Sequence, residues 1–133
     1  GMNNRTQAIR IPAPGRIEIR AVDGSANPYL AAAAILAAGI AGIEENADPG
    51  KPNLENLYTL SQEEIAARGI RTLPANLLDA VRAAEKDDAL RSWLGNTGTE
   101  DYLDYFCKVK REEWQEYHVQ VSDWELRRYL TLF

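Results

Sequence analysis

The run from Tyr29 to Ile43 constrains the fold of this chain more than any other stretch. It is apolar on every side over fifteen residues and is rich in alanine. Alanine favours helix, and a helix that is hydrophobic all round is typical of one buried on all sides. Asn27 can cap its start, and Pro28 suits the first helical position, where its missing N–H is not needed. The sequence therefore predicts a helix that needs neighbours on every side, which a chain of 133 residues is short to supply.

Shorter helices are predicted further along the chain. Ser61 and Glu64 have the spacing of a capping box and begin a helix that lasts to about Arg68. Pro74 is expected to begin the next helix. A further short helix, with Leu90, Trp93 and Leu94 as its apolar residues, closes at Gly95.

A long helix is predicted from about Thr99. Its apolar positions recur at steps of three and four residues, as in the stripe of Leu103, Phe106, Trp114, Tyr117 and Val121. Ser122 and Glu125 form a second capping box, so we expect this helix to end there and a last short helix to follow.

The N-terminal part of the chain alternates instead. From Arg16 to Arg20 the charged and apolar residues take turns, and side chains of a strand point to opposite faces with period two. Ile9 to Ile11 repeat the alternation, and the breakers at positions 12–15 would reverse the chain. We therefore predict a β-hairpin with Ile17 and Ile19 against a core. The opposite face would carry Arg10, Arg16, Glu18 and Arg20.

Two interpretations of that charged face are open. On the pattern alone, a solvated surface with ion pairs between strands is the commoner outcome. The other interpretation is an anion site, because guanidinium groups bind phosphate or carboxylate through paired hydrogen bonds. Three arginines around one carboxylate would suit a site that handles both phosphate oxygens and a divalent cation.

Composition limits the classes of function. The net charge of −5 and the mixing of charge signs argue against a nucleic-acid surface. The sequence contains no Gly-rich phosphate loop and no dinucleotide fingerprint. The longest apolar run is too short to span a bilayer, so a cytoplasmic protein without membrane contact is expected. Gly1 before Met2 has the appearance of a residue left by tag cleavage.

Cys107 and His118 are the only residues of their types. A single cysteine excludes an intrachain disulfide, and its apolar neighbours predict a buried thiol. With a single histidine, a zinc site or a Ser-His or Cys-His triad is excluded within the chain. We expect His118 to have no catalytic role.

The chain contains a series of linked motifs, in this order: Asn4-Arg5-Thr6, Ala8 to Pro12, Arg16 to Arg20, Asp23, Ala26 to Leu30, Ala37 to Ile40, Gly42-Ile43, Asp48-Pro49-Gly50 and Asn56-Leu57-Tyr58. Together they resemble the C-terminal catalytic segment of the glutamine synthetase family. The ending, with Glu113-Trp114, Ser122 to Glu125 and Tyr129-Leu130, looks most like the branch that includes γ-glutamylmethylamide synthetases. The resemblance covers essentially the whole chain. It implies an α+β fold, in which a short hairpin precedes a mainly helical bundle. Residues 1–133 would be one incomplete domain, the C-terminal part of the catalytic domain.

The resemblance also implies roles for individual residues. Arg5 matches an arginine between the nucleotide phosphates and glutamate, while Arg10 and Arg16 match arginines on the ATP side. Glu18 matches a ligand of Mg²⁺ or Mn²⁺, and Arg20 matches the arginine that holds the glutamate substrate. No residue of the chain matches a proton-transferring or nucleophilic catalytic group. With the family in view, the anion-site interpretation of the hairpin is the better one.

The implied activity is that of a ligase of nitrogen metabolism and glutamine biosynthesis. ATP would phosphorylate glutamate, and ammonia or a small amine would displace the phosphate to give a γ-glutamyl amide. The family implies a homo-oligomer, and the chain alone is expected to be inactive. An alternative is a naturally short protein that starts at Met2 and acts as a non-catalytic helical assembly or regulatory module. An in-frame upstream extension encoding the rest of the enzyme would remove that alternative.

Tyr58 has two interpretations. Asn56-Leu57-Tyr58 resembles the loop in which some bacterial glutamine synthetases carry a tyrosine that is adenylylated. Thr59 and Ser61 differ from the residues expected around such a tyrosine. A tyrosine that anchors a surface loop is therefore the preferred interpretation.

Overall fold

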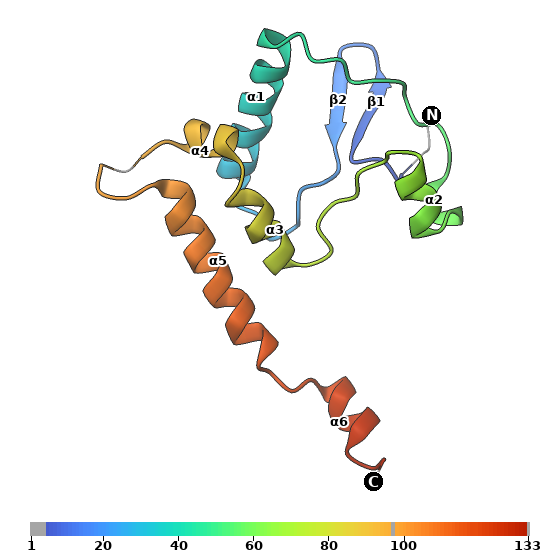
Figure 1. Ribbon diagram of the computed structural model, residues 1–133, viewed down its shortest axis with the longest axis vertical. Coiled ribbons are helices and arrows are strands. Elements are labelled where there is room, and N and C mark those ends of the chain that lie inside the picture. The colour runs from blue at the N-terminus through green and yellow to red at the C-terminus, as the bar shows by residue number, and fades with distance from the viewer. Residues whose placement is uncertain (1–4, 97, 133) are drawn as a thin grey trace. The chain divides into compact units, whose positions relative to one another are not determined.

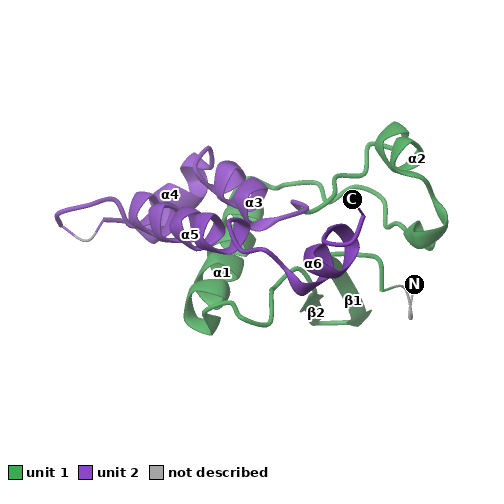
Figure 2. Ribbon diagram, turned by 90° about the horizontal axis from the view of Figure 1, so that it is seen from below, with its two compact units in different colours: residues 1–73 green, residues 74–133 purple. Residues whose placement is uncertain are grey.

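The computed structural model describes residues 5–96 and 98–132, so Gly1, Met2 and Asn4 of the expectations above lie outside the described residues. It confirms the α+β class, because a two-stranded hairpin precedes a series of helices (Figure 1). The elements in chain order are β1 (Ile9–Ala13), β2 (Arg16–Ile19), α1 (Pro28–Glu44), the 3₁₀ helix η1 (Leu57–Thr59), α2 (Gln62–Ala67), α3 (Leu77–Ala84), α4 (Asp88–Leu94), α5 (Tyr102–His118) and α6 (Asp123–Tyr129). Two compact units, residues 1–73 and 74–133, are coloured separately in Figure 2 and are described separately here.

The hairpin of the first unit is antiparallel. Its register pairs Ile9 with Ile19, Arg10 with Glu18 and Ala13 with Arg16, with an irregularity between the last two pairs. The ladder continues beyond β2, because the Arg20 N–H donates to the Ala8 carbonyl at 2.8 Å. The turn is at Pro14-Gly15, where Gly15 adopts a φ of 75° that favours glycine.

The apolar face of the hairpin is exposed, which corrects the expectation for Ile17. Ile9, Ile11 and Ile17 are 62%, 73% and 67% exposed, and only Ile19 is half-buried. The alternation was read correctly, but no element in the described part of the chain buries this face. The charged face is the more enclosed of the two, since Arg10 and Glu18 are both half-buried.

Helix α1 starts as predicted but is not buried. The Asn27 side chain accepts hydrogen bonds from the N–H groups of Tyr29 and Leu30, and Pro28 occupies the first turn. No residue of α1 is buried, and Tyr29 and Ile43 are 85% and 77% exposed. The expectation of burial on all sides was wrong for this chain because its described residues do not supply the neighbours that such a helix needs.

The second unit has a small core between α3, α4 and α5. Val81, Leu103 and Cys107 are buried there, and Ala84, Leu90 and Leu94 pack against them. The predicted burial of Cys107 is confirmed, and burial raises the pKa of its thiol. Arg91 of α4 pairs with Asp101 and Asp104 at 2.9 Å each, which ties α4 to the start of α5.

The predicted helix caps are largely confirmed. Ser61 and Ser122 both form capping boxes, and α4 ends at Gly95 with a φ of 72°. Two starts were placed too early. Helix α3 begins after the cap Asn76 rather than at Pro74, and α5 begins after the cap Asp101 rather than near Thr99.

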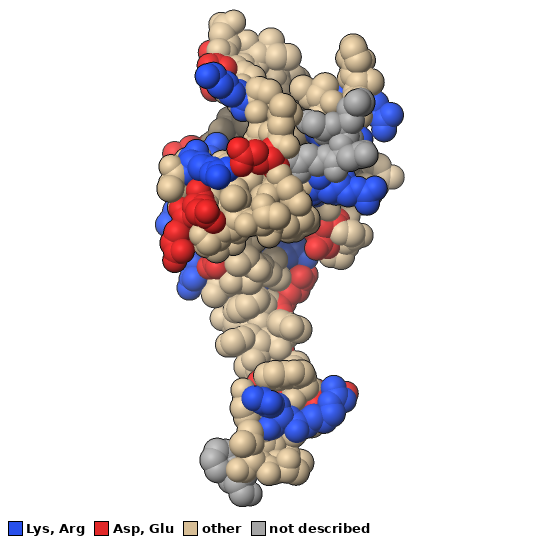
Figure 3. Space-filling view, turned by 90° about the vertical axis from the view of Figure 1, so that its right-hand side faces the viewer, with Lys and Arg blue, Asp and Glu red and all other residues tan. Residues whose placement is uncertain are grey.

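Within the predicted apolar stripe of α5, Leu103 is buried and Phe106 and Trp114 are half-buried. Tyr117 is 73% exposed, and Val121 lies beyond the end of the helix and is 68% exposed. His118, in the last turn, stacks on Trp114 with ring centroids 5.3 Å apart. Exposed apolar side chains continue along α6, among them Trp124 and Leu126. In Figure 3, uncharged side chains cover most of the narrow middle of the view, and a group of Lys and Arg side chains lies at its lower end. Within the described ranges, no helix combines the length and hydropathy needed to cross a bilayer.

Candidate functional site

The charged face of the hairpin carries Arg10, Arg16, Glu18 and Arg20, which we call the hairpin cluster. In it, Glu18 is ion-paired with Arg10 and Arg20. Arg10 faces Glu18 directly across the strands, and its Nη1 lies 3.3 Å from both carboxylate oxygens. Arg20, two residues after Glu18 on the same face, donates from Nη1 to Oε1 at 3.0 Å. The structure thus brings Arg10, Glu18 and Arg20 together as the alternation predicts.

The cluster keeps Glu18 ionised. The hydrogen bond from Arg20 is the main cause of a lowered pKa of Glu18, and the positive charges of Arg10, Arg20 and Arg16 act in the same direction. Arg16 itself is exposed at the start of β2. Its electrostatic effect on Glu18 agrees with a position on the same face.

Arg10 retains an unused hydrogen-bond donor. Its Nε is buried and has no hydrogen-bond partner, although Nη1 of the same guanidinium is engaged by Glu18. A buried donor without an acceptor is costly, and a phosphate oxygen is a strong acceptor for a guanidinium N–H. The residues present therefore fit an anionic ligand at Arg10.

Arg5 lies apart from these contacts. It is exposed and precedes the hairpin ladder, and the contacts described for the hairpin cluster do not include it. Its neighbour Thr6 accepts a hydrogen bond from the Leu57 N–H of η1 at 3.4 Å. Sequence reasoning treated Thr6 only as part of a motif and assigned it no role.

The described residues do not make a metal site by themselves. Among them, no group of three or more His, Cys, Asp or Glu side chains is placed to hold an ion. Mg²⁺ requires several oxygen ligands in near-octahedral geometry. Glu18 fits only as one ligand of a larger site, and its carboxylate would have to loosen its pairing with Arg10 or Arg20 to bind an ion.

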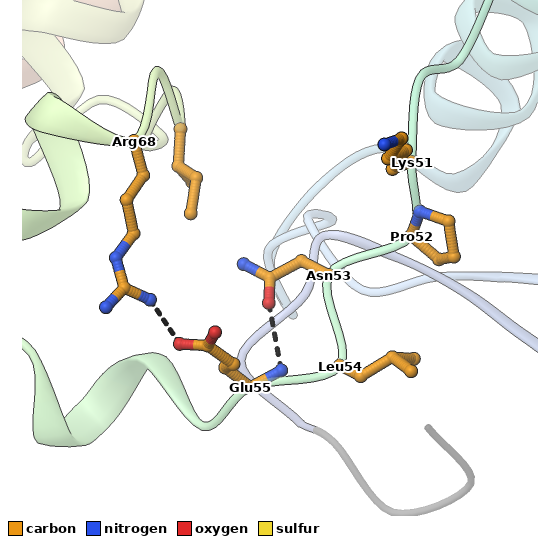
Figure 4. A pocket seen from close by; sticks show the side chains of 7 residues that line it. Lys51, Pro52, Asn53, Leu54, Glu55 and Arg68 are labelled. Carbon is orange, nitrogen blue, oxygen red and sulfur yellow. Dashed lines mark hydrogen bonds and ion pairs between the residues drawn. The ribbon is translucent and has the colours of Figure 1, made fainter.

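A shallow hollow of about 430 Å³ lies elsewhere in the first unit (Figure 4). It is lined by Lys51, Pro52, Asn53, Leu54, Glu55, Arg68 and Ile70. Arg68 pairs with Glu55, and the Asn53 side chain accepts from the Glu55 N–H at 2.9 Å, as the dashed lines in Figure 4 show. These polar groups already bind one another, so the hollow is a weaker candidate site than the hairpin.

The regulatory interpretation of Tyr58 is not tested by its surroundings. Tyr58 lies in η1, is 81% exposed, and its N–H donates to the Asn56 side chain at 3.1 Å. Exposure of the ring agrees with the preferred interpretation as a surface tyrosine.

Comparison with known proteins identifies the family. Residues 1–129 match the model of the family described as glutamine synthetase, catalytic domain. The chain is 47% identical over 133 residues to a glutamate–methylamine ligase of Methyloversatilis universalis, covering 100% of this chain and 29% of the relative. It is 44% identical over 134 residues to a glutamine synthetase of Halobacterium salinarum, covering 98% of this chain and 29% of the relative.

A solved structure described as apo GmaS without ligand superposes with a TM-score of 0.78 at 47% identity. The match covers 97% of this chain and 28% of that chain. The chain therefore spans less than a third of the length of these relatives. Their agreement over almost all of its residues shows that the chain belongs to the glutamine synthetase catalytic-domain family.

Proposed function

We propose that this chain supplies the C-terminal part of the catalytic domain of an ATP-dependent ligase that joins ammonia or a small amine to the γ-carboxyl group of glutamate. The observation that carries the proposal is the hairpin cluster, in which Glu18 is paired with Arg10 and Arg20 on one face. The relatives named as glutamine synthetase and glutamate–methylamine ligase support the reaction class. Residues 1–133 would form one incomplete domain.

Different arginines would bind the two anionic substrates, ATP and glutamate. Arg10, with its unpaired Nε, and Arg16 would bind phosphate oxygens of ATP. Arg20 would bind a carboxylate of glutamate, and Arg5 would lie between the two substrates. Positive charge of this kind stabilises the negative charge on a phosphoryl group during transfer and aligns the two substrates.

Glu18 would contribute one ligand to a divalent metal, Mg²⁺ or Mn²⁺. When bound, such an ion neutralises phosphate charge. Its remaining ligands would come from outside this chain, since the described residues contain no complete set. The lowered pKa of Glu18 keeps its carboxylate ionised, as a metal ligand must be.

A chimeric enzyme tests the proposed activity. The 133 residues would replace the matching C-terminal segment of the Methyloversatilis ligase, to which they are 47% identical. We expect glutamate-dependent and amine-dependent release of phosphate from ATP, and a comparison of ammonia with methylamine would show which acceptor is used. A chimera that assembles like its parent but forms no γ-glutamyl amide would contradict the proposal.

The chain alone should be inactive, because one carboxylate holds Mg²⁺ poorly. Purified chain incubated with ATP, glutamate, methylamine and Mg²⁺ should release no more phosphate than its Glu18→Gln variant. Metal-dependent and glutamate-dependent turnover that this substitution abolishes would show that the site is complete within these residues. We also propose that the longer enzyme is a cytoplasmic homo-oligomer, in line with the family resemblance.

A further inference from the structure

A side chain of the segment that carries Arg5 forms a hydrogen bond to η1. The hydroxyl oxygen of Thr6 accepts a hydrogen bond from the Leu57 N–H at 3.4 Å, across 51 residues of sequence, and Thr6 and Leu57 are both half-buried. The Gln7 side-chain amide donates to the same oxygen at 3.4 Å. Thr6 thus connects the residues that precede the hairpin to η1.

The hydrogen bond between Thr6 and Leu57 satisfies a backbone N–H at the start of η1. The first N–H groups of a helical turn lack partners inside the turn, and side chains usually satisfy them. Asn56 caps η1 by accepting from the Tyr58 N–H, which leaves the Leu57 N–H to an acceptor outside the turn. Thr6 provides that acceptor.

The same segment also holds Arg20. Two residues after Thr6, the Ala8 carbonyl accepts from the Arg20 N–H at 2.8 Å. Residues 5–8 therefore link η1, Arg5 and the backbone of Arg20. In the proposed function Arg20 binds glutamate, and Arg5 lies between glutamate and the nucleotide.

We propose that Thr6 is a positioning residue that holds Arg5 and Arg20 in the geometry for glutamate by anchoring residues 5–8 to η1. The inference rests on the proposed function for its catalytic consequence, but the anchor itself is a property of this chain. It makes η1, with its exposed Tyr58, a place from which a change in conformation reaches Arg5 and Arg20 through the backbone of residues 5–8.

The anchor is tested first in the chain alone. Thr6→Val removes the hydroxyl while keeping the shape, and it should raise the exchange rate of the Leu57 amide about three- to tenfold. Hydrogen-exchange mass spectrometry measures that rate at low micromolar concentration, below the range in which the chain is expected to self-associate. Thr6→Ser keeps the acceptor and should restore slow exchange. Thr72→Val, at an exposed position of the same unit, is the matched control. Unchanged exchange of the Leu57 amide in Thr6→Val would overturn the proposal.

The catalytic consequence is tested in the chimera. Thr6→Val should raise the KM for glutamate about three- to tenfold, should raise the KM for ATP by a smaller factor, and should change kcat little. Leu57→Pro removes the donor at a position that tolerates proline, so it should have the same effect, and the double variant should be no worse than either single one. Equal changes in both KM values, or none, in an active chimera would overturn the positioning role. An inactive parent chimera would count against the proposed ligase, while amide exchange would still decide the anchor.

Discussion

At the scale of single residues, the role of Glu18 separates the two interpretations of the hairpin. It is ion-paired with Arg10 and Arg20 in the structure, and the proposed function requires it to bind a metal. Paired as it is, the carboxylate could equally belong to a salt-bridged surface hairpin. Substitutions at Glu18 and Arg20 separate these possibilities, because a ligand of a metal and a ligand of glutamate should fail in different ways.

In the chimera, Glu18→Gln should lower kcat by at least about tenfold and recover partly with excess Mn²⁺, because it removes a charged ligand needed during phosphoryl transfer. Arg20→Lys keeps the charge but loses the paired hydrogen bonds, so it should mainly raise the KM for glutamate. Steady-state kinetics with each substrate varied in turn gives both values. If both variants keep normal kinetics and lose only thermal stability, the surface-hairpin interpretation is correct.

The pH dependence of the hairpin follows from the lowered pKa of Glu18. Because the folded pKa lies below the unfolded value of about 4.3, the stabilisation by the ion pairs is complete above that pH and is lost as the pH falls through the folded pKa. A carbon-detected NMR titration of the Glu18 carboxyl should show this low pKa. In Arg20→Gln the pKa should rise, because the hydrogen bond that lowers it most is gone. An ordinary pKa in the unsubstituted chain would contradict the described pairing.

At the scale of elements, the α3–α4–α5 core is the best-buried part of the chain. Leu103 is 0% exposed and lies against Val81 and Cys107, so its side chain fills the centre of this core. Leucines elsewhere are mostly surface residues, such as Leu126 of α6, which is 45% exposed.

Leu103→Ala should destabilise the second unit by about 2–5 kcal/mol, since it removes apolar contacts and leaves a cavity. Urea unfolding followed by tryptophan fluorescence reports on this unit, because Trp93 and Trp114 lie in α4 and α5. Leu126→Ala is the control and should cost less than about 1 kcal/mol. Equal losses for the two variants would show that the described core is not the stabilising one.

The local parts of this architecture were predictable from sequence. Caps such as Asn27, Ser61 and Ser122 act on N–H groups two or three residues away, so their signals are complete within a short window. Helices α3 and α5 were placed too early because Pro74 and Thr99 precede the true caps Asn76 and Asp101 as plausible starts.

The shared face of Arg10, Glu18 and Arg20 followed from the alternation and the reversing turn, while their specific ion pairs were not predicted. Exposure was not predictable in the same way. Apolar periodicity shows which side of a strand or helix prefers burial, but burial itself depends on neighbours. Ile17 and the side chains of α1 are apolar, but the described residues include no neighbours that bury them. The Thr6–Leu57 contact was missed because it joins positions too far apart for any local pattern to connect.

At the scale of the whole molecule, the chain exposes much apolar surface. Leu36, Ile40 and Ile43 of α1 are 66%, 55% and 77% exposed. Patches of this kind usually mark surfaces that are covered in a larger assembly. The family relationship agrees with that interpretation, because the chain spans only 29% of relatives such as the Halobacterium glutamine synthetase.

We therefore expect the isolated chain to self-associate at tens of micromolar. Light scattering should show species larger than a monomer, and Ile43→Lys should shift the distribution toward monomer by placing a charge on the exposed end of α1. Lys51→Arg, which changes neither charge nor apolar area appreciably, is the control. A strict monomer across the concentration range would contradict this prediction and show that the exposed apolar side chains of α1 do not drive self-association.

The buried thiol of Cys107 is a probe of local opening in the second unit. Thiol reagents attack the thiolate, and the raised pKa and 2% exposure of this side chain suppress that form and block access. Cys107 is the only cysteine of the chain, so every modification event reports on this one place. The rate at which an alkylating reagent labels the native protein then measures how often α3, α4 and α5 separate. Because the first unit contains no thiol, its opening would leave that rate unchanged unless the two units open together.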